Sequence, residues 1–165
     1  MAASIARKKA FGIGLTDAVA LLFIYLVPTL SHLTAVPFYL IDPMRLAVLG
    51  ALLATRNWKN ALVLAVTLPL FSSAVGMHPV FPKCVLIAVE LAANVLLFVW
   101  LARKLNAGIA AFISILCSKL LYYGLKAAVL YSGLLQMELV STTLWIQLVV
   151  AIIISAAFGM WFVRD

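Results

Sequence analysis

The sequence predicts an all-α membrane protein with six transmembrane helices and both termini in the cytoplasm. Of the 165 residues, 67% are hydrophobic and only 10% are charged, and the mean hydropathy is +1.20. This composition leaves too little polar surface to cover a soluble globule. Apolar stretches recur along the chain and are separated by short polar turns. We therefore expect a single integral membrane domain over residues 1–165, embedded in the lipid bilayer, without a separate soluble domain.

Each expected helix is an apolar run bounded by charged residues, prolines or polar turns. A spanning helix needs about 20 residues, so the second run is short and needs residues of the preceding loop, 31–43, to complete its span. That loop contains two prolines and a short apolar turn, and it reads as a lid over the bundle. We expect helices at about 11–30, 44–55, 61–75, 83–102, 107–131 and 143–163.

The formal net charge of +7 reflects membrane orientation rather than a nucleic-acid partner. Lys and Arg lie mostly at the ends of the expected helices, and they concentrate in alternate connections. Cytoplasmic loops of membrane proteins carry this excess of Lys and Arg. The side that holds the N-terminal cluster 7–9, the turns 56–59 and 103–104 and Arg164 is therefore expected to be cytoplasmic.

Polar side chains form a stripe on each of two neighbouring helices. In the helix 83–102, Lys83, Glu90 and Asn94 are spaced seven and four residues apart, so they share one face. An ionisable residue within a span is costly and marks a functional site by default. The second stripe, on the helix 107–131, consists of Lys119, Tyr122, Tyr123 and Lys126.

The two helices run in opposite directions, so Glu90 and Lys119 are expected at similar depth near the middle of the bundle. One interpretation is an internal ion pair between them that fixes helix register. The other interpretation is a ligand site, because Glu90 alone cannot neutralise or satisfy two lysines and two tyrosines of the second stripe. An anion or a polar heterocycle would then be the missing partner of these side chains. Trp145 either adds a stacking face to this site or is an interfacial belt residue.

The small residues Ala10, Gly14 and Ala18 recur every four positions at the start of the first helix. This spacing places them on one face, where another helix can approach closely. The face fits either a partner subunit or packing within the chain. Asp17 is expected to pair with a basic group of the same protein or to mark a contact with a partner.

Signatures of enzymes and of metal sites are missing from the sequence. There is no HExxH, no GxSxG and no glycine-rich phosphate loop, and His32 and His78 are isolated. Cys84 and Cys117 lack the CxxC spacing of redox or zinc sites. We therefore expect no catalytic residue, no metal and no cofactor in this chain.

The stretch 76–104 resembles the substrate-binding S components of energy-coupling factor (ECF) vitamin transporters. The resemblance rests on Gly76-Met77-His78-Pro79 with Phe81-Pro82, on Glu90-Leu91-Ala92, and on the basic pair Arg103-Lys104 that ends the helix. Chain length, six expected helices, cytoplasmic termini and a proline-containing first outer loop also agree with that family.

The resemblance implies an S-component-like bundle in the cell membrane that captures a vitamin or vitamin precursor from outside. A membrane-embedded coupling subunit and two ATPase subunits, which use ATP, would supply the energy. The residues expected to contact the substrate are Glu90, Asn94, Lys119, Tyr122, Tyr123, Lys126, His78 and Trp145. The coupling face that the resemblance implies is Ala10, Gly14 and Ala18, although here the small-residue pattern has Gly at its centre and lies closer to the helix start. The alternative is a structural or assembly membrane protein, similar to the MreD group of cell-shape factors, that needs no ligand.

Overall fold

The computed structural model describes residues 2–34, 38–76, 79–133 and 144–162, and these residues form an all-helical bundle. His78 and all of the residues 134–143, including Glu138, lie outside the described residues. The bundle consists of α1 (Ala2–Thr34), η1 (Phe38–Ile41), α2 (Pro43–Thr55), α3 (Trp58–Gly76), α4 (Phe81–Leu101), α5 (Ala107–Tyr131) and α6 (Leu144–Trp161).

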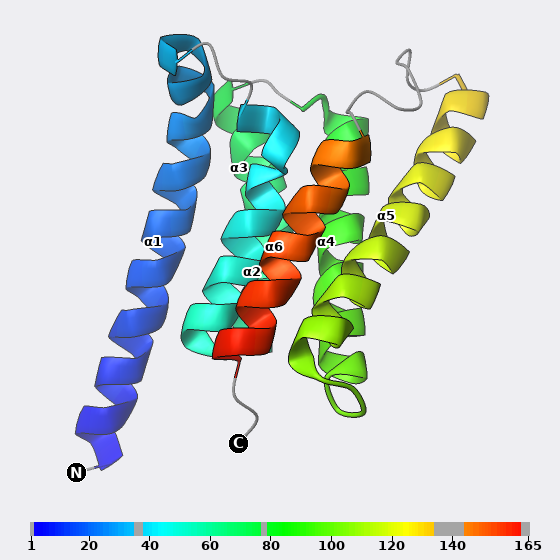
Figure 1. Ribbon diagram of the computed structural model, residues 1–165. Helices are drawn as coiled ribbons and strands as arrows, with labels where there is room; N and C mark the ends of the chain where they lie inside the picture. Colours follow the sequence, from blue (N-terminus) through cyan, green and yellow to red (C-terminus); the bar gives the residue numbers. More distant parts are fainter. Residues whose placement is uncertain (1, 35–37, 77–78, 134–143, 163–165) are drawn as a thin grey trace.

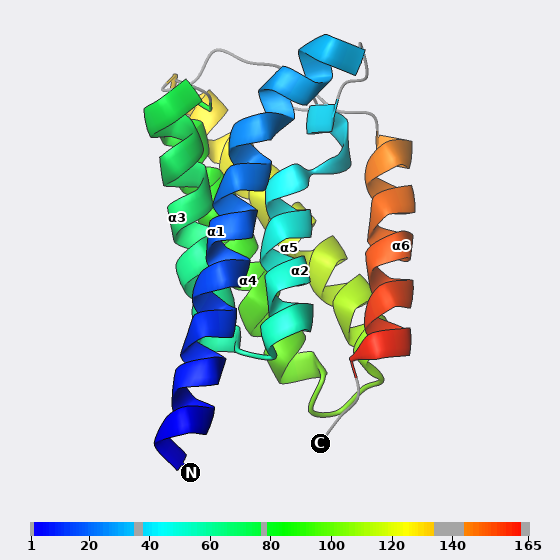
Figure 2. The same ribbon diagram turned by 90° about the vertical axis from the view of Figure 1, so that its left-hand side faces the viewer.

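The helices run up and down the long axis of the bundle, and the start of α1 and the end of α6 lie at the same end (Figures 1 and 2). We call this the terminal end, and the opposite end, which carries η1 and the start of α4, the distal end. Helix α4 packs between α3 and α5, α6 packs on α5, and α1 packs on α2 and α3. The η1 turn contacts both α1 and α6, so it bridges two helices at the distal end.

Five of the helices are long and apolar enough to cross a membrane: α1 from Ala10 onward, α3, α4, α5 and α6. A set of helices of this length and hydrophobicity indicates a membrane-embedded multi-pass protein. The sixth expected helix is α2, which has 13 residues and therefore extends about 20 Å at 1.5 Å per residue. A bilayer core is about 30 Å thick, and the preceding η1 turn extends the same chain segment toward the distal end.

The helix boundaries follow from local chemistry at several positions. The start of α5 is fixed by Asn106, whose side chain accepts a hydrogen bond from the Gly108 backbone N–H at 2.8 Å. Helix α2 begins with Pro43 as its first residue, where a missing N–H has no cost. Helix α1 is longer than the expected 11–30 at both ends: its basic N-terminal segment is helical, and residues 31–34 of the expected loop extend the helix to Thr34.

The core is apolar and is densest toward the terminal end. Phe98 of α4 packs edge-on against Phe158 and Phe162, with ring centroids 4.8 and 5.2 Å away. Gly108 and Gly159 let α5 and α6 approach closely there: a Cβ added at Gly108 would lie 2.9 Å from the Ser155 carbonyl oxygen and 3.2 Å from the Gly159 Cα. The crossing of α5 and α6 therefore depends on the missing side chain at Gly108.

We predict that Gly108→Ala destabilises the bundle, because the added methyl group meets backbone atoms that cannot move aside independently. Overpacking of this kind costs about 1–3 kcal/mol. The matched control is Gly124→Ala in the same helix, where an added Cβ meets nothing within 4 Å. Thermal unfolding in detergent should show a lower transition temperature for Gly108→Ala and an unchanged or higher one for Gly124→Ala; equal transitions would contradict the close approach.

Candidate functional site

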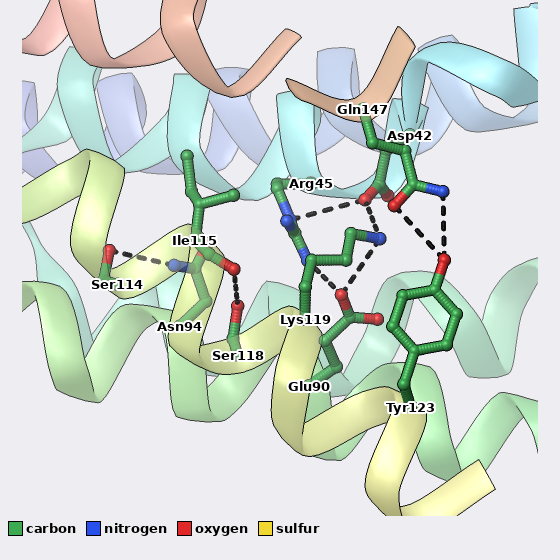
Figure 3. A network of polar contacts seen from close by, with 10 residues as sticks. All are labelled: Asp42, Arg45, Glu90, Asn94, Ser114, Ile115, Ser118, Lys119, Tyr123 and Gln147. Atoms are coloured by element: carbon green, nitrogen blue, oxygen red, sulfur yellow. Dashed lines mark hydrogen bonds and ion pairs between the residues drawn. The ribbon is translucent and has the colours of Figure 1, made fainter. Parts of the chain in front are cut away.

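Four charged side chains meet inside the bundle and form what we call the ionic network: Asp42, Arg45, Glu90 and Lys119 (Figure 3). Glu90 is the tenth of the 21 residues of α4, and Lys119 is the thirteenth of the 25 residues of α5, so both lie near the middle of their helices. The Lys119 Nζ lies 3.1 Å from the Glu90 Oε1. The structure thus pairs the two residues that the sequence placed at similar depth.

Arg45 is the residue that ties α2 into the network. Its side chain is 2% exposed, and its Nη2 donates to the Glu90 Oε1. Its Nε lies 3.4 Å from the Asp42 Oδ2. The sequence analysis did not include Arg45 or Asp42 in the site. The available signal was a charged residue within the apolar run 44–55, three positions after a carboxylate.

Asp42 closes the network from the junction between η1 and α2. Its backbone is left-handed, with φ 55° and ψ 61°, and its side chain does not cap the helix that it precedes. The carboxylate instead points into the bundle, where its Oδ2 lies 2.8 Å from the Lys119 Nζ. Aspartate tolerates this backbone region better than most residues, so the turn directs the charge inward.

The charges of the ionic network balance without a ligand. From sequence, Glu90 was expected to be the single carboxylate facing Lys119 and Lys126. The structure supplies a second carboxylate, Asp42, and a further cation, Arg45, so the ionic network holds two negative and two positive groups. Lys119 is therefore already neutralised within the network, and Lys126 lies outside it.

Asn94 lies one turn beyond Glu90 on α4, and it faces α5 (Figure 3). Its Nδ2 donates to the Ser114 Oγ at 3.0 Å, and both side chains are almost completely buried. Among the described residues, the Asn94 Oδ1 has no hydrogen-bond donor. The Ser118 Oγ, also buried, donates to the Ile115 carbonyl. The polar α4–α5 contact thus continues from the ionic network toward the terminal end.

The remaining residues of the α5 stripe lie toward the distal end. The Tyr122 ring lies between two ammonium groups, with its centroid 5.7 Å from the Lys119 Nζ and 5.9 Å from the Lys126 Nζ. Lys126 is 1% exposed. The Gln147 Nε2 of α6 donates to the Tyr123 hydroxyl at 3.2 Å. The stripe predicted from sequence is therefore one continuous face, and α6 contributes Gln147 to it.

Other predicted residues lie away from this face. Trp145 is 75% exposed on the first turn of α6, which favours its interpretation as an interfacial belt residue. Ala10, Gly14 and Ala18 are exposed along α1.

Asp17 forms a contact within the chain, but its partner is an amide rather than the expected basic group: the Asn60 Nδ2 donates to the Asp17 Oδ1 at 2.6 Å.

Breaking the Arg45–Glu90 pair should be strongly destabilising, because either single change leaves a buried charge short of a partner. We expect Arg45→Met and Glu90→Met each to lower the free energy of unfolding by about 3–5 kcal/mol. The double variant should recover much of that loss, since both charges are gone. Unfolding titrations in mixed micelles measure the coupling, and strictly additive losses would contradict a direct pair. Lys59→Met, an exposed lysine on α3, is the control.

Asp42 should contribute to stability through its two cationic neighbours, because Arg45 and Lys119 each lose a counter-charge when the carboxylate is removed. We expect Asp42→Asn to lower the temperature of thermal unfolding in detergent. An unchanged unfolding temperature would contradict the pairing.

The arrangement is suited to holding a polar partner by charge and hydrogen bonds. The network supplies two carboxylates, a guanidinium and an ammonium. Next to it lie the phenols of Tyr122 and Tyr123 on α5 and the side-chain amides of Asn94 and Gln147 on α4 and α6. Among the residues that the structure describes, no group of three or more His, Cys, Asp or Glu side chains is placed to hold a metal ion. Comparisons with protein-family models, with curated protein sequences and with solved structures found no match to this chain.

Proposed function

We propose that this protein is a membrane subunit that binds a small polar nutrient and delivers it across the bilayer. The observation that carries the proposal is the ionic network, which places four charged groups among membrane-length apolar helices. Charged residues within spanning segments are expensive and mark substrate or ion pathways by default. Two of these groups, Asp42 and Lys119, remain partly exposed, so the network is not wholly enclosed by packing.

The transporter class that we propose is the ECF type, with this chain as the S component that captures a vitamin or vitamin precursor. In this proposal α2 with η1 acts as the sixth span, and both termini lie in the cytoplasm of a cell whose plasma membrane holds the protein. The described basic residues support this orientation. Exposed Lys and Arg gather at the terminal end, at Arg7, Arg56, Lys59, Arg103 and Lys104.

The proposed partners are a membrane-embedded coupling subunit and two ATPase subunits. The exposed face of α1 that carries Ala10, Gly14 and Ala18 supports a helix-packing role for this surface, because a Cβ added at Gly14 meets nothing within 4 Å inside the chain. Small residues at such a face let two helices approach closely in a membrane. The proposed substrate contacts are those of the two polar stripes.

A second candidate is a structural or assembly membrane protein of the MreD type. One observation favours it: the ionic network neutralises itself, so it serves to fix helix register without any ligand. The two candidates differ in one measurable property. A binding subunit holds a small molecule in a manner that depends on Lys119, whereas a structural protein does not.

We expect the purified protein to retain or to bind a vitamin-like compound. Native mass spectrometry from a mild detergent tests for a co-purified molecule, and thermal shift with a panel of water-soluble vitamins and their precursors tests for added ones. Lys119→Met and Glu90→Gln should weaken binding at least tenfold, because each removes a charged group from the proposed site. The control Lys104→Met, at the terminal end, should bind as wild type does.

Folding must be separated from binding in this experiment. Each variant is first checked for a single symmetrical peak in size-exclusion chromatography, and only folded variants are compared. A folded wild-type protein that retains no small molecule and responds to no compound of the panel would reject the transport proposal. The MreD-like candidate would then be tested by searching for a partner helix on the α1 face.

A further inference from the structure

The ionic network divides into an enclosed pair and a reachable pair. The side chains of Arg45 and Glu90 are 2% and 4% exposed, and they form the enclosed pair. The side chains of Lys119 and Asp42 are 19% and 22% exposed, and they form the reachable pair, although the Asp42 Oδ2 that contacts Lys119 is itself buried. A small molecule would therefore meet the exposed parts of these two side chains first and would have to compete with their mutual contact, while the contact between Arg45 and Glu90 stays in place.

Charge balance restricts what such a molecule can be. The four groups sum to zero, and the enclosed pair is neutral by itself. Because Asp42 also contacts Arg45 and Lys119 also contacts Glu90, the four groups balance as a set. A ligand with a net charge would leave this set with an unbalanced charge inside the bundle, where such a charge is costly. A ligand that carries one positive and one negative group satisfies both members of the reachable pair and preserves neutrality.

The surroundings of the reachable pair also fit a polar organic molecule. Tyr123 lies four residues after Lys119 on α5, and the Gln147 Nε2 of α6 donates to its hydroxyl at 3.2 Å (Figure 3). The ring of Tyr122 lies 5.7 Å from the Lys119 Nζ. These groups offer neutral hydrogen-bonding atoms and an aromatic surface to the uncharged part of a ligand.

We propose that the reachable pair is the binding site for a compact zwitterion, whose cationic group pairs with Asp42 and whose anionic group pairs with Lys119. The inference rests on the proposed function and names the chemical class of its substrate. Because Asp42 Oδ2 and Lys119 Nζ are 2.8 Å apart before a ligand enters, the two ligand charges must lie close together. An amino-acid-like arrangement, with the charges separated by one or two carbon atoms, meets this requirement.

The test uses compounds whose charges are masked one at a time. The panel consists of the proteinogenic amino acids, β-alanine and the water-soluble vitamins, measured by thermal shift and then by calorimetry. We expect the tightest binder to be zwitterionic at pH 7. Its methyl ester, which lacks the anionic group, and its N-acetyl derivative, which lacks the cationic group, should each bind at least tenfold more weakly.

Two variants connect each ligand charge to one residue. Lys119→Gln should weaken binding of the parent compound at least tenfold but should not weaken binding of the methyl ester, because the ester has already lost the group that pairs with Lys119 and its positive charge balances the carboxylate that remains. Asp42→Asn should show the same pattern with the N-acetyl derivative. Asp17→Asn, which alters a carboxylate outside the network, is the control and should leave all three affinities within twofold of wild type.

The ligand derivatives with one charge masked test the zwitterion assignment on the wild-type protein, so the test does not depend on whether a variant folds. A tightest binder with a net charge, or one without charges, would overturn the zwitterion assignment while leaving the proposed function standing. Masked derivatives that bind as tightly as the parent would overturn it as well. Binding of no compound would reject the proposed function itself, and with it this inference.

Discussion

The structure depends on the requirement that charged groups inside an apolar bundle find partners. Apolar side chains cannot set the depth or rotation of helices in a membrane with much precision, because lipid tails offer them an equivalent environment. Arg45 must meet Glu90, and Lys119 must meet both carboxylates, which fixes α2, α4 and α5 relative to one another. The network therefore supplies the specific register that hydrophobicity alone does not.

The same requirement explains why one cluster suits both a structural and a binding role. The enclosed pair of Arg45 and Glu90 holds helices together and exposes almost nothing. The reachable pair of Asp42 and Lys119 connects the η1 junction to α5 and retains exposed surface. The first pair suffices for a structural role, whereas the proposed binding role uses the exposure of the second pair.

Helices with strong boundary chemistry were predictable from sequence. The α5 limits were expected at 107–131 and are found there, because Asn106 caps the start and the polar turn before it excludes helix continuation. The α2 helix was expected, but Arg45 is its third residue, and a basic residue near a helix end is usually interpreted as an orientation signal rather than as part of the core. Asp42 was treated as a loop residue, since sequence gives no sign that a left-handed turn would direct its carboxylate inward. Half of the ionic network was missed for these reasons.

The interior is asymmetric, and this limits the direction from which a ligand reaches the network. Polar groups follow α4 and α5 from Tyr122 through the network to Asn94 and Ser114, where they end. Beyond them, toward the terminal end, lie the aromatic cluster around Phe98 and the close approach of α5 and α6 at Gly108. A molecule at the reachable pair therefore arrives from the distal end. In the proposed function, delivery toward the terminal end would require α4, α5 and α6 to separate there, because among the described residues packed aromatic rings and the close approach of α5 and α6 occupy that end.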